Sequence, residues 1–238
     1  SGDHKSAVAL LEANLATPEV QSDDYMAGIC AALLGSERRT LGNPGKAIED
    51  ATTALVRFER AKDKGQQRSC HLEIARSWEQ LGKLERAVES YRSAVTLDEE
   101  GELDAERAQD LKSLAQMQEK AGDIPEALKT WQELLYQKER EKDIFGQGEC
   151  RLKMAKVYKK LGNSATAAEY RKEGQRLQEQ AEHDMQGANE SAVFNKLSDE
   201  AQQRLSSGDI SGAYKGYEAM LAEARKRGFK NGMGFGLR

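Results

Sequence analysis

The sequence is poor in the residues that support disulfide-bonded, metal-binding or transmembrane folds. Among 238 residues there are three prolines, three cysteines and three histidines, and aromatic residues make up only 6%. So few prolines permit long helices. No apolar run reaches the roughly 18 residues that suggest a transmembrane helix, and no start typical of a signal peptide is present. We therefore expect a soluble protein without membrane insertion.

Charge is abundant but nearly balanced. Charged residues make up 32% of the chain, the formal net charge is −4, and hydrophobic residues make up 38%. An acidic chain has no general attraction for nucleic acid, so we expect no nucleic-acid partner. The hydrophobic fraction is enough for a thin core. This balance favours an extended helical array with much surface over one compact ball.

One turn sequence recurs at a fixed spacing. Glycine stands at four positions that lie 40 residues apart, at Gly42, Gly82, Gly122 and Gly162. Gly2 falls one period earlier, and Gly208 follows after 46 residues, so the last step contains six extra residues. We interpret these glycines as helix ends with a positive φ, after which a second helix begins. The 238 residues then correspond to about six periods.

Small residues recur around each turn. Alanine stands five residues after every one of these glycines, at Ala7, Ala47, Ala87, Ala127, Ala167 and Ala213. A small residue stands seven before, at Gly35, Ala75, Ala115, Ala155 and Ala201. Small residues let two helices approach closely, and bulky ones such as Tyr91 and Trp131 fill the remaining space. Each unit is therefore predicted to be helix, tight turn, helix, and neighbouring units must stack to bury their apolar stripes.

The order of small residue, turn glycine, alanine and aromatic resembles the tetratricopeptide repeat. The 40-residue period is similar to the longer repeats of the LGN/Pins, kinesin-light-chain and rapsyn groups and of Rap-type peptide sensors. The resemblance implies an all-α superhelix, a solenoid of about five to six units, with the first helices on its concave face. It also implies a protein-interaction scaffold in the cytoplasm, with cytoskeletal or ciliary assembly as an alternative.

Residue patterns also predict the limits of the helices. Helices are expected at 6–16, 24–40, 45–61, 67–80, 85–98, 104–120, 125–141, 147–160, 165–186, 191–206 and 211–227. The predicted organisation is a repeat array over 1–174, an extended helix or hinge over 175–190, and a further unit with the start of another over 191–238. Gly187 is expected to end the long helix. Gly65, Gly101, Gly146 and Gly228 are expected between units. Both ends fall in mid-unit, so we expect a fragment of a longer array.

The sequence contains no recognisable catalytic or metal site. Cys30, Cys70 and Cys150 each stand twelve residues before a turn glycine, in different units, so they are expected to be buried and unbridged, and Asp110 takes the same position in the unit between. The three histidines also lie in different units. Carboxylate runs such as 98–100 are expected at solvated helix ends. We therefore expect no enzyme, no cofactor and no metal.

A binding groove is predicted on the outward stripe of the first helices. Its candidate partner-binding residues are Arg39, Leu72, Arg76, Lys112, Gln116, Leu152, Lys156 and Lys159. The basic residues favour an acidic protein or peptide segment, and the leucines offer apolar footholds. The alternative is an ordinary solvated helix surface. The pattern lacks the Lys and Asn pair of chaperone-tail co-chaperones. Two alternative functions are a peptide-sensing regulatory domain and a structural element that self-associates through its end units.

Overall fold

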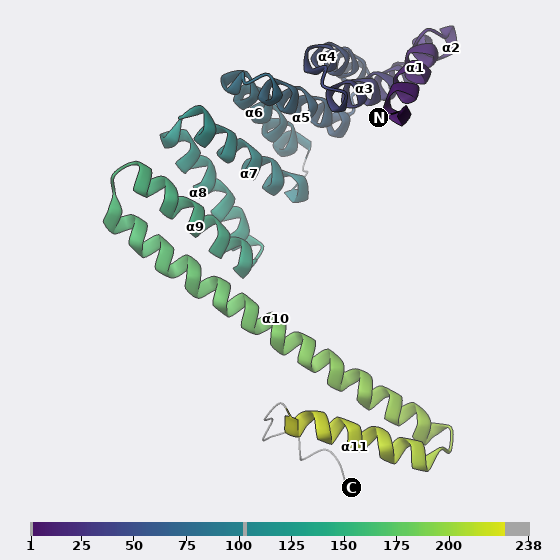
Figure 1. Ribbon diagram of the computed structural model, residues 1–238, viewed down its shortest axis with the longest axis vertical. Helices are drawn as coiled ribbons and strands as arrows, with labels where there is room; N and C mark the ends of the chain where they lie inside the picture. Colours follow the sequence, from purple (N-terminus) through teal and green to yellow (C-terminus); the bar gives the residue numbers. More distant parts are fainter. Residues whose placement is uncertain (1, 102–103, 227–238) are drawn as a thin grey trace. The chain divides into compact units, whose positions relative to one another are not determined.

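The computed structural model describes residues 2–101 and 104–226, and within them the chain is α-helical (Figure 1). The first helices of the repeat are α3 (Asp24–Thr40), α5 (Lys64–Gln80), α7 (Asp104–Ala121) and α9 (Ile144–Lys160). Their second helices are α4 (Pro44–Ala61), α6 (Leu84–Gly101), α8 (Ile124–Arg140) and α10 (Ser164–Ser206). The remaining helices are α1 (Gly2–Leu15), α2 (Pro18–Ser22) and α11 (Ile210–Lys226). None of the described helices is apolar enough over a sufficient length to cross a membrane.

The turn within each unit has the predicted conformation. The turn glycines have φ values between 70° and 85°, at Gly42, Gly82, Gly122, Gly162 and Gly208. Residues with a Cβ adopt such angles at a cost, whereas glycine does not. Pro44 and Pro125 lie in the first turn of α4 and α8, where a missing N–H is tolerated. The helix–turn–helix prediction is therefore confirmed for these units.

The turns between units differ from the prediction. Lysines, rather than glycines, adopt the left-handed conformation, because both Lys62 and Lys142 have φ of 57°. The aspartate that follows each of them caps the next helix: Asp63 accepts a hydrogen bond from Gln66 N, and Asp143 accepts one from Gly146 N. Gly65 and Gly146 consequently lie inside α5 and α9, and Gly101 ends α6. Gly228 lies outside the described residues.

Small residues form the contacts between helices, as the repeat predicts. Ala47, Ala87 and Ala127 are fully buried, as is Ala75 on the first helix of its unit. Large side chains then fill the core, and the Trp131 side chain is also fully buried. Sixteen buried residues on α5 to α9 form one continuous apolar cluster, so several units share a core.

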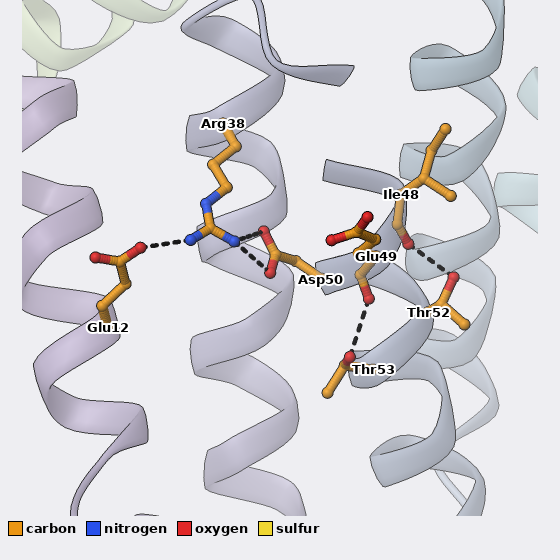
Figure 2. A network of polar contacts seen from close by, with 7 residues as sticks. All are labelled: Glu12, Arg38, Ile48, Glu49, Asp50, Thr52 and Thr53. Carbon is orange, nitrogen blue, oxygen red and sulfur yellow. Dashed lines mark hydrogen bonds and ion pairs between the residues drawn. The ribbon is translucent and has the colours of Figure 1, made fainter. Parts of the chain in front are cut away.

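A network of polar contacts, only partly buried, joins helices at the beginning of the array (Figure 2). The Arg38 guanidinium on α3 donates to both carboxylate oxygens of Asp50 on α4 at 2.7 Å, and it also pairs with Glu12 on α1. Burial raises the pKa of Asp50, and the Arg38 charge opposes that rise. Thr52 and Thr53 on α4 donate to carbonyl oxygens one turn earlier in the same helix. Arg38 therefore joins three helices through one planar group.

The chain divides into two compact units, residues 1–176 and residues 177–238. The first contains α1 to α9 and the beginning of α10. The second contains the rest of α10 and α11, which pack closely, since a Cβ on Gly216 would lie 2.9 Å from the Ala201 Cβ. Ala201 and Ala213 are buried there, as the repeat pattern predicts.

The largest differences from the predicted helices are in α10, α1 and α2. α10 runs through Gly187 for 43 residues, whereas two helices with a loop near Gly187 were expected. A glycine inside a helix costs about 1 kcal/mol but does not end it. Near the beginning, α1 starts at Gly2, so this glycine is helical, and Pro18 opens the unexpected short helix α2.

Candidate functional site

Ion pairs connect each first helix to the next along the array. Each pair joins residues 34 to 41 positions apart, namely Arg39 with Glu73 (2.5 Å), Glu79 with Lys120 (2.5 Å), Lys112 with Glu149 (2.7 Å) and Glu119 with Lys160 (2.9 Å). Side chains of α3, α5, α7 and α9 therefore meet on one face, which we call the first-helix face.

Two of these pairs are copies of one another. Glu119 and Lys160 stand exactly one 40-residue period after Glu79 and Lys120. Exposed ion pairs of this kind each contribute about 0–1 kcal/mol to stability. These pairs matter more for binding than for stability, because they neutralise lysines and glutamates that would otherwise be open to a ligand.

The basic residues predicted to bind a partner fall into two groups. Arg39 and Lys112 are engaged in the ion pairs between first helices. Arg76 and Lys156 are exposed, and no ion pair involves either of them within the described residues. Lys159 is also exposed, but it lines a separate hollow with residues of α10, among them Ser164 and Arg171. The predicted basic stripe is therefore only partly available to a ligand.

The two predicted apolar footholds are less exposed than a binding groove requires, and Leu72 is buried in the core. Leu72 is only 7% exposed and belongs to the core cluster. Leu152 is half-buried and lies against α10, since a Cβ on Gly174 would be 2.9 Å from the Leu152 Cγ. The position ten residues before the turn glycine thus faces packed neighbours. The spacing of residues along a helix predicts which side of that helix they share. It does not predict how much of that side the adjacent helices cover.

An open pocket of about 480 Å³ lies between α7 and α9. It brings together two predicted residues, Gln116 and Lys156, with Glu119, Lys120, Lys153 and Lys160. We call this the lysine pocket. Glu119 lies on the outward stripe but was not predicted to bind, and sequence reasoning missed Lys120, Lys153 and Lys160 because it followed that single stripe. The 40-residue period could have identified two of them, because Lys120 and Lys160 both stand two residues before a turn glycine.

The lysine pocket has an excess of positive charge. Glu119 pairs with Lys160, and Lys120 pairs with Glu79 on α5. Lys153 and Lys156 lie about one helical turn apart on α9, and neither has an acidic partner within the described residues. These two ammonium groups can donate hydrogen bonds to carboxylates or other anions without first breaking an ion pair.

The cysteines are buried thiols. Each is at most 7% exposed and none is bridged. Burial raises the pKa of Cys70 to about 12 and that of Cys150 to about 11. These two thiols stay protonated at neutral pH, so they are poor nucleophiles and poor metal ligands. The prediction of buried, unbridged cysteines is confirmed.

Comparisons with known proteins agree with this architecture. Residues 70–100 match the family described as tetratricopeptide repeat. A putative kinesin light chain of Podosopora anserina with nearly identical tetratricopeptide-like repeats is 17% identical, with 76% of this chain and 89% of that chain covered and a TM-score of 0.62. BtubC from P. vanneervenii is 15% identical, with 99% and 95% covered and a TM-score of 0.57.

The apo form of RapI is 14% identical to this chain, with 93% and 90% of the two chains covered and a TM-score of 0.59. No curated protein matches the sequence. At these identities the solved structures establish the fold alone. The resemblance to the tetratricopeptide repeat is thus confirmed, as is the all-α superhelical fold class.

Proposed function

We propose that this chain is a scaffold without catalytic activity, which binds an extended or helical segment of a partner protein along its first-helix face. The observation that carries the proposal is the lysine pocket, where Lys153 and Lys156 have no acidic partner within the described residues although neighbouring lysines do. The tetratricopeptide-repeat fold typically serves as a non-enzymatic scaffold, and the similar solved structures include a putative kinesin light chain and RapI.

The chemistry of this face favours an acidic segment. A partner carboxylate in the pocket between α7 and α9 meets the positive charge of Lys153 and Lys156. Arg76 on α5 adds a second exposed cation. Apolar anchors of the partner must lie elsewhere than on Leu72, which is buried.

Charge reversal at the pocket tests the proposal. The probe is a short fluorescein-labelled peptide of alternating Glu and Leu, and its binding is measured by fluorescence anisotropy. We expect the double variant Lys153→Glu, Lys156→Glu to bind it at least about tenfold more weakly, since each lost charge pair weakens binding by about 1 kcal/mol. Lys112 is left unchanged, because a glutamate there would face Glu149 and strain the array.

A matched control separates local from general electrostatics. Lys46→Glu with Lys172→Glu makes the same change in net charge on exposed residues of the second helices α4 and α10. Its affinity is expected to stay close to that of the unchanged protein. If both double variants weaken binding equally, or neither does, the peptide does not bind at the lysine pocket. Circular dichroism of all variants shows whether helicity is preserved.

A further inference from the structure

Three charged side chains from three successive helices meet where α5, α6 and α7 pack. Arg68 Nε on α5 lies 2.8 Å from Asp98 Oδ1 on α6. It donates to Asp110 Oδ2 on α7 at 2.8 Å, and Arg68 Nη2 donates to Asp110 Oδ1 at 3.0 Å. The Asp98 side chain is 0% exposed and that of Asp110 is 2% exposed. Asp98 is therefore in the core, although the sequence predicts it at a solvated helix end.

The hydrogen bonds of this cluster are unequally shared. A guanidinium Nε carries one hydrogen, and that hydrogen is directed at Asp110. Asp110 thus receives two hydrogen bonds, whereas neither carboxyl oxygen of Asp98 receives one within the described residues. An ionised carboxylate that is removed from water and receives no hydrogen bond is strongly disfavoured. Two ionised aspartates with one arginine would also leave a net negative charge in the core.

A proton on Asp98 removes both problems. It cancels the excess charge, and it provides an O–H that can donate to the carboxylate of Asp110. The charged groups that act on Asp98 are Arg68 from α5 and Asp110 and Glu106 from α7. Burial and then the charge of Asp110 raise the pKa of Asp98 to about 7, Arg68 opposes this rise, and Glu106 adds to it.

We propose that the packing of α6 against α7 is a pH-responsive joint, which is closed when Asp98 carries a proton and loosened when Asp98 is ionised. This joint connects the unit α5/α6 to the unit α7/α8. Loosening it would alter the spacing of α5 and α7. The ion pair between Glu79 on α5 and Lys120 on α7 lies on the first-helix face of the same two helices. The proposal stands on the buried cluster and is independent of what the lysine pocket binds.

The direction of the pH effect follows from proton binding. Asp in an unfolded chain has a pKa of about 3.9, whereas folded Asp98 keeps its proton up to about pH 7. The folded state therefore holds one more proton than the unfolded state between these values. Raising the pH through this window lowers stability, and the loss is complete above the pKa of folded Asp98.

Denaturant unfolding of the whole chain at several pH values, followed by the fluorescence of Trp78 and Trp131 in the compact unit that also contains Asp98, tests the joint. We expect the unfolding constant of the unchanged protein to include a component that rises by up to about tenfold per pH unit until about pH 7, because one proton is released. Asp98→Asn keeps the shape and a hydrogen-bond donor but cannot ionise, so it should lack this component. Glu85→Gln removes an exposed carboxylate from the same helix and should follow the unchanged protein. Equal pH slopes for all three proteins would overturn the proposal.

Two measurements on the unchanged protein do not depend on how the variants fold. A ¹³C NMR titration of the Asp98 side-chain carboxyl is expected to have its midpoint near pH 7, and a midpoint near pH 4 would refute a proton held by Asp98 at neutral pH. Hydrogen exchange, corrected for its intrinsic pH dependence, should report selective loss of protection in α6 and α7 above pH 7. The helices α3 and α4 serve as the internal reference. Equal changes in all four helices would refute a local joint.

Discussion

At the residue scale, a single glycine can decide how closely two helices approach, because it has no side chain. Gly28 on α3 is buried, and a Cβ there would lie 2.8 Å from the Phe58 Cε1 on α4. Phe58 is itself fully buried, so its ring has little room to move. Gly45, in the first turn of α4, has nothing within 4 Å of the corresponding position. The same residue type thus serves packing at one site and not at the other.

This contrast makes a matched pair of substitutions informative. Gly28→Ala is expected to destabilise the fold by about 1–3 kcal/mol, because the added methyl overlaps the Phe58 ring. Gly45→Ala should be neutral or stabilise by up to about 1 kcal/mol, since it lowers the conformational entropy of the unfolded chain. Urea unfolding of both variants checks the sign. Equal effects would mean that α3 and α4 are not in close contact at Gly28.

At the scale of the helices, α10 is the element in which local signals were misleading. Gly187 and the six extra residues indicated a loop, but the helix continues through them for 43 residues. A lone glycine is a weak signal for a helix end unless its φ is positive, and that angle depends on the turn that follows.

Substitutions at Gly187 distinguish a continuous helix from a loop. In a continuous helix Gly187→Ala should increase stability by about 1 kcal/mol, and Gly187→Pro should cost about 3 kcal/mol and reduce helicity. Circular dichroism at 222 nm with thermal melting measures both effects. If the proline variant melts like the unchanged protein, residues around 187 do not form part of a continuous helix.

The periodic features of the fold were predictable because each has a strong local cause. The turn glycines need a positive φ, and the alanines that follow them need a minimal side chain at a helix contact. Lys62 was missed because the cap that Asp63 provides to α5 offsets the cost of a left-handed lysine. Leu72 and Asp98 were misassigned because their burial requires neighbouring helices that one-dimensional patterns do not place. For the same reason, only Gln116 and Lys156 of the lysine pocket were found.

At the scale of the whole molecule, the two compact units have unequal cores. Residues 1–176 contain the large apolar cluster on α5 to α9 as well as a smaller cluster around Phe58. The described part of residues 177–238 has few buried apolar side chains, namely Leu177, Ala181, Ala201 and Ala213. Buried apolar area is the main source of stability, so the second unit should be the weaker one.

Unfolding of the complete chain should therefore not be a single transition. Both tryptophans, Trp78 and Trp131, lie in the first unit, so their fluorescence reports on that unit alone. Helicity by circular dichroism reports on both units. With increasing urea we expect part of the helicity to be lost before the fluorescence changes. Coincident curves would show that the two units unfold together.

The ion pairs between first helices also give the array a direction. On α7, Lys120 pairs backward with Glu79 of α5, while Glu119 pairs forward with Lys160 of α9. Two adjacent residues in the last turn of α7 therefore provide a lysine for the preceding unit and a glutamate for the following unit. A tandem copy of residues 104–143 would bring its own lysine for the unit before it and its own glutamate for the unit after it. The sequence of this array can therefore be lengthened by whole periods while every such pair along the face is retained.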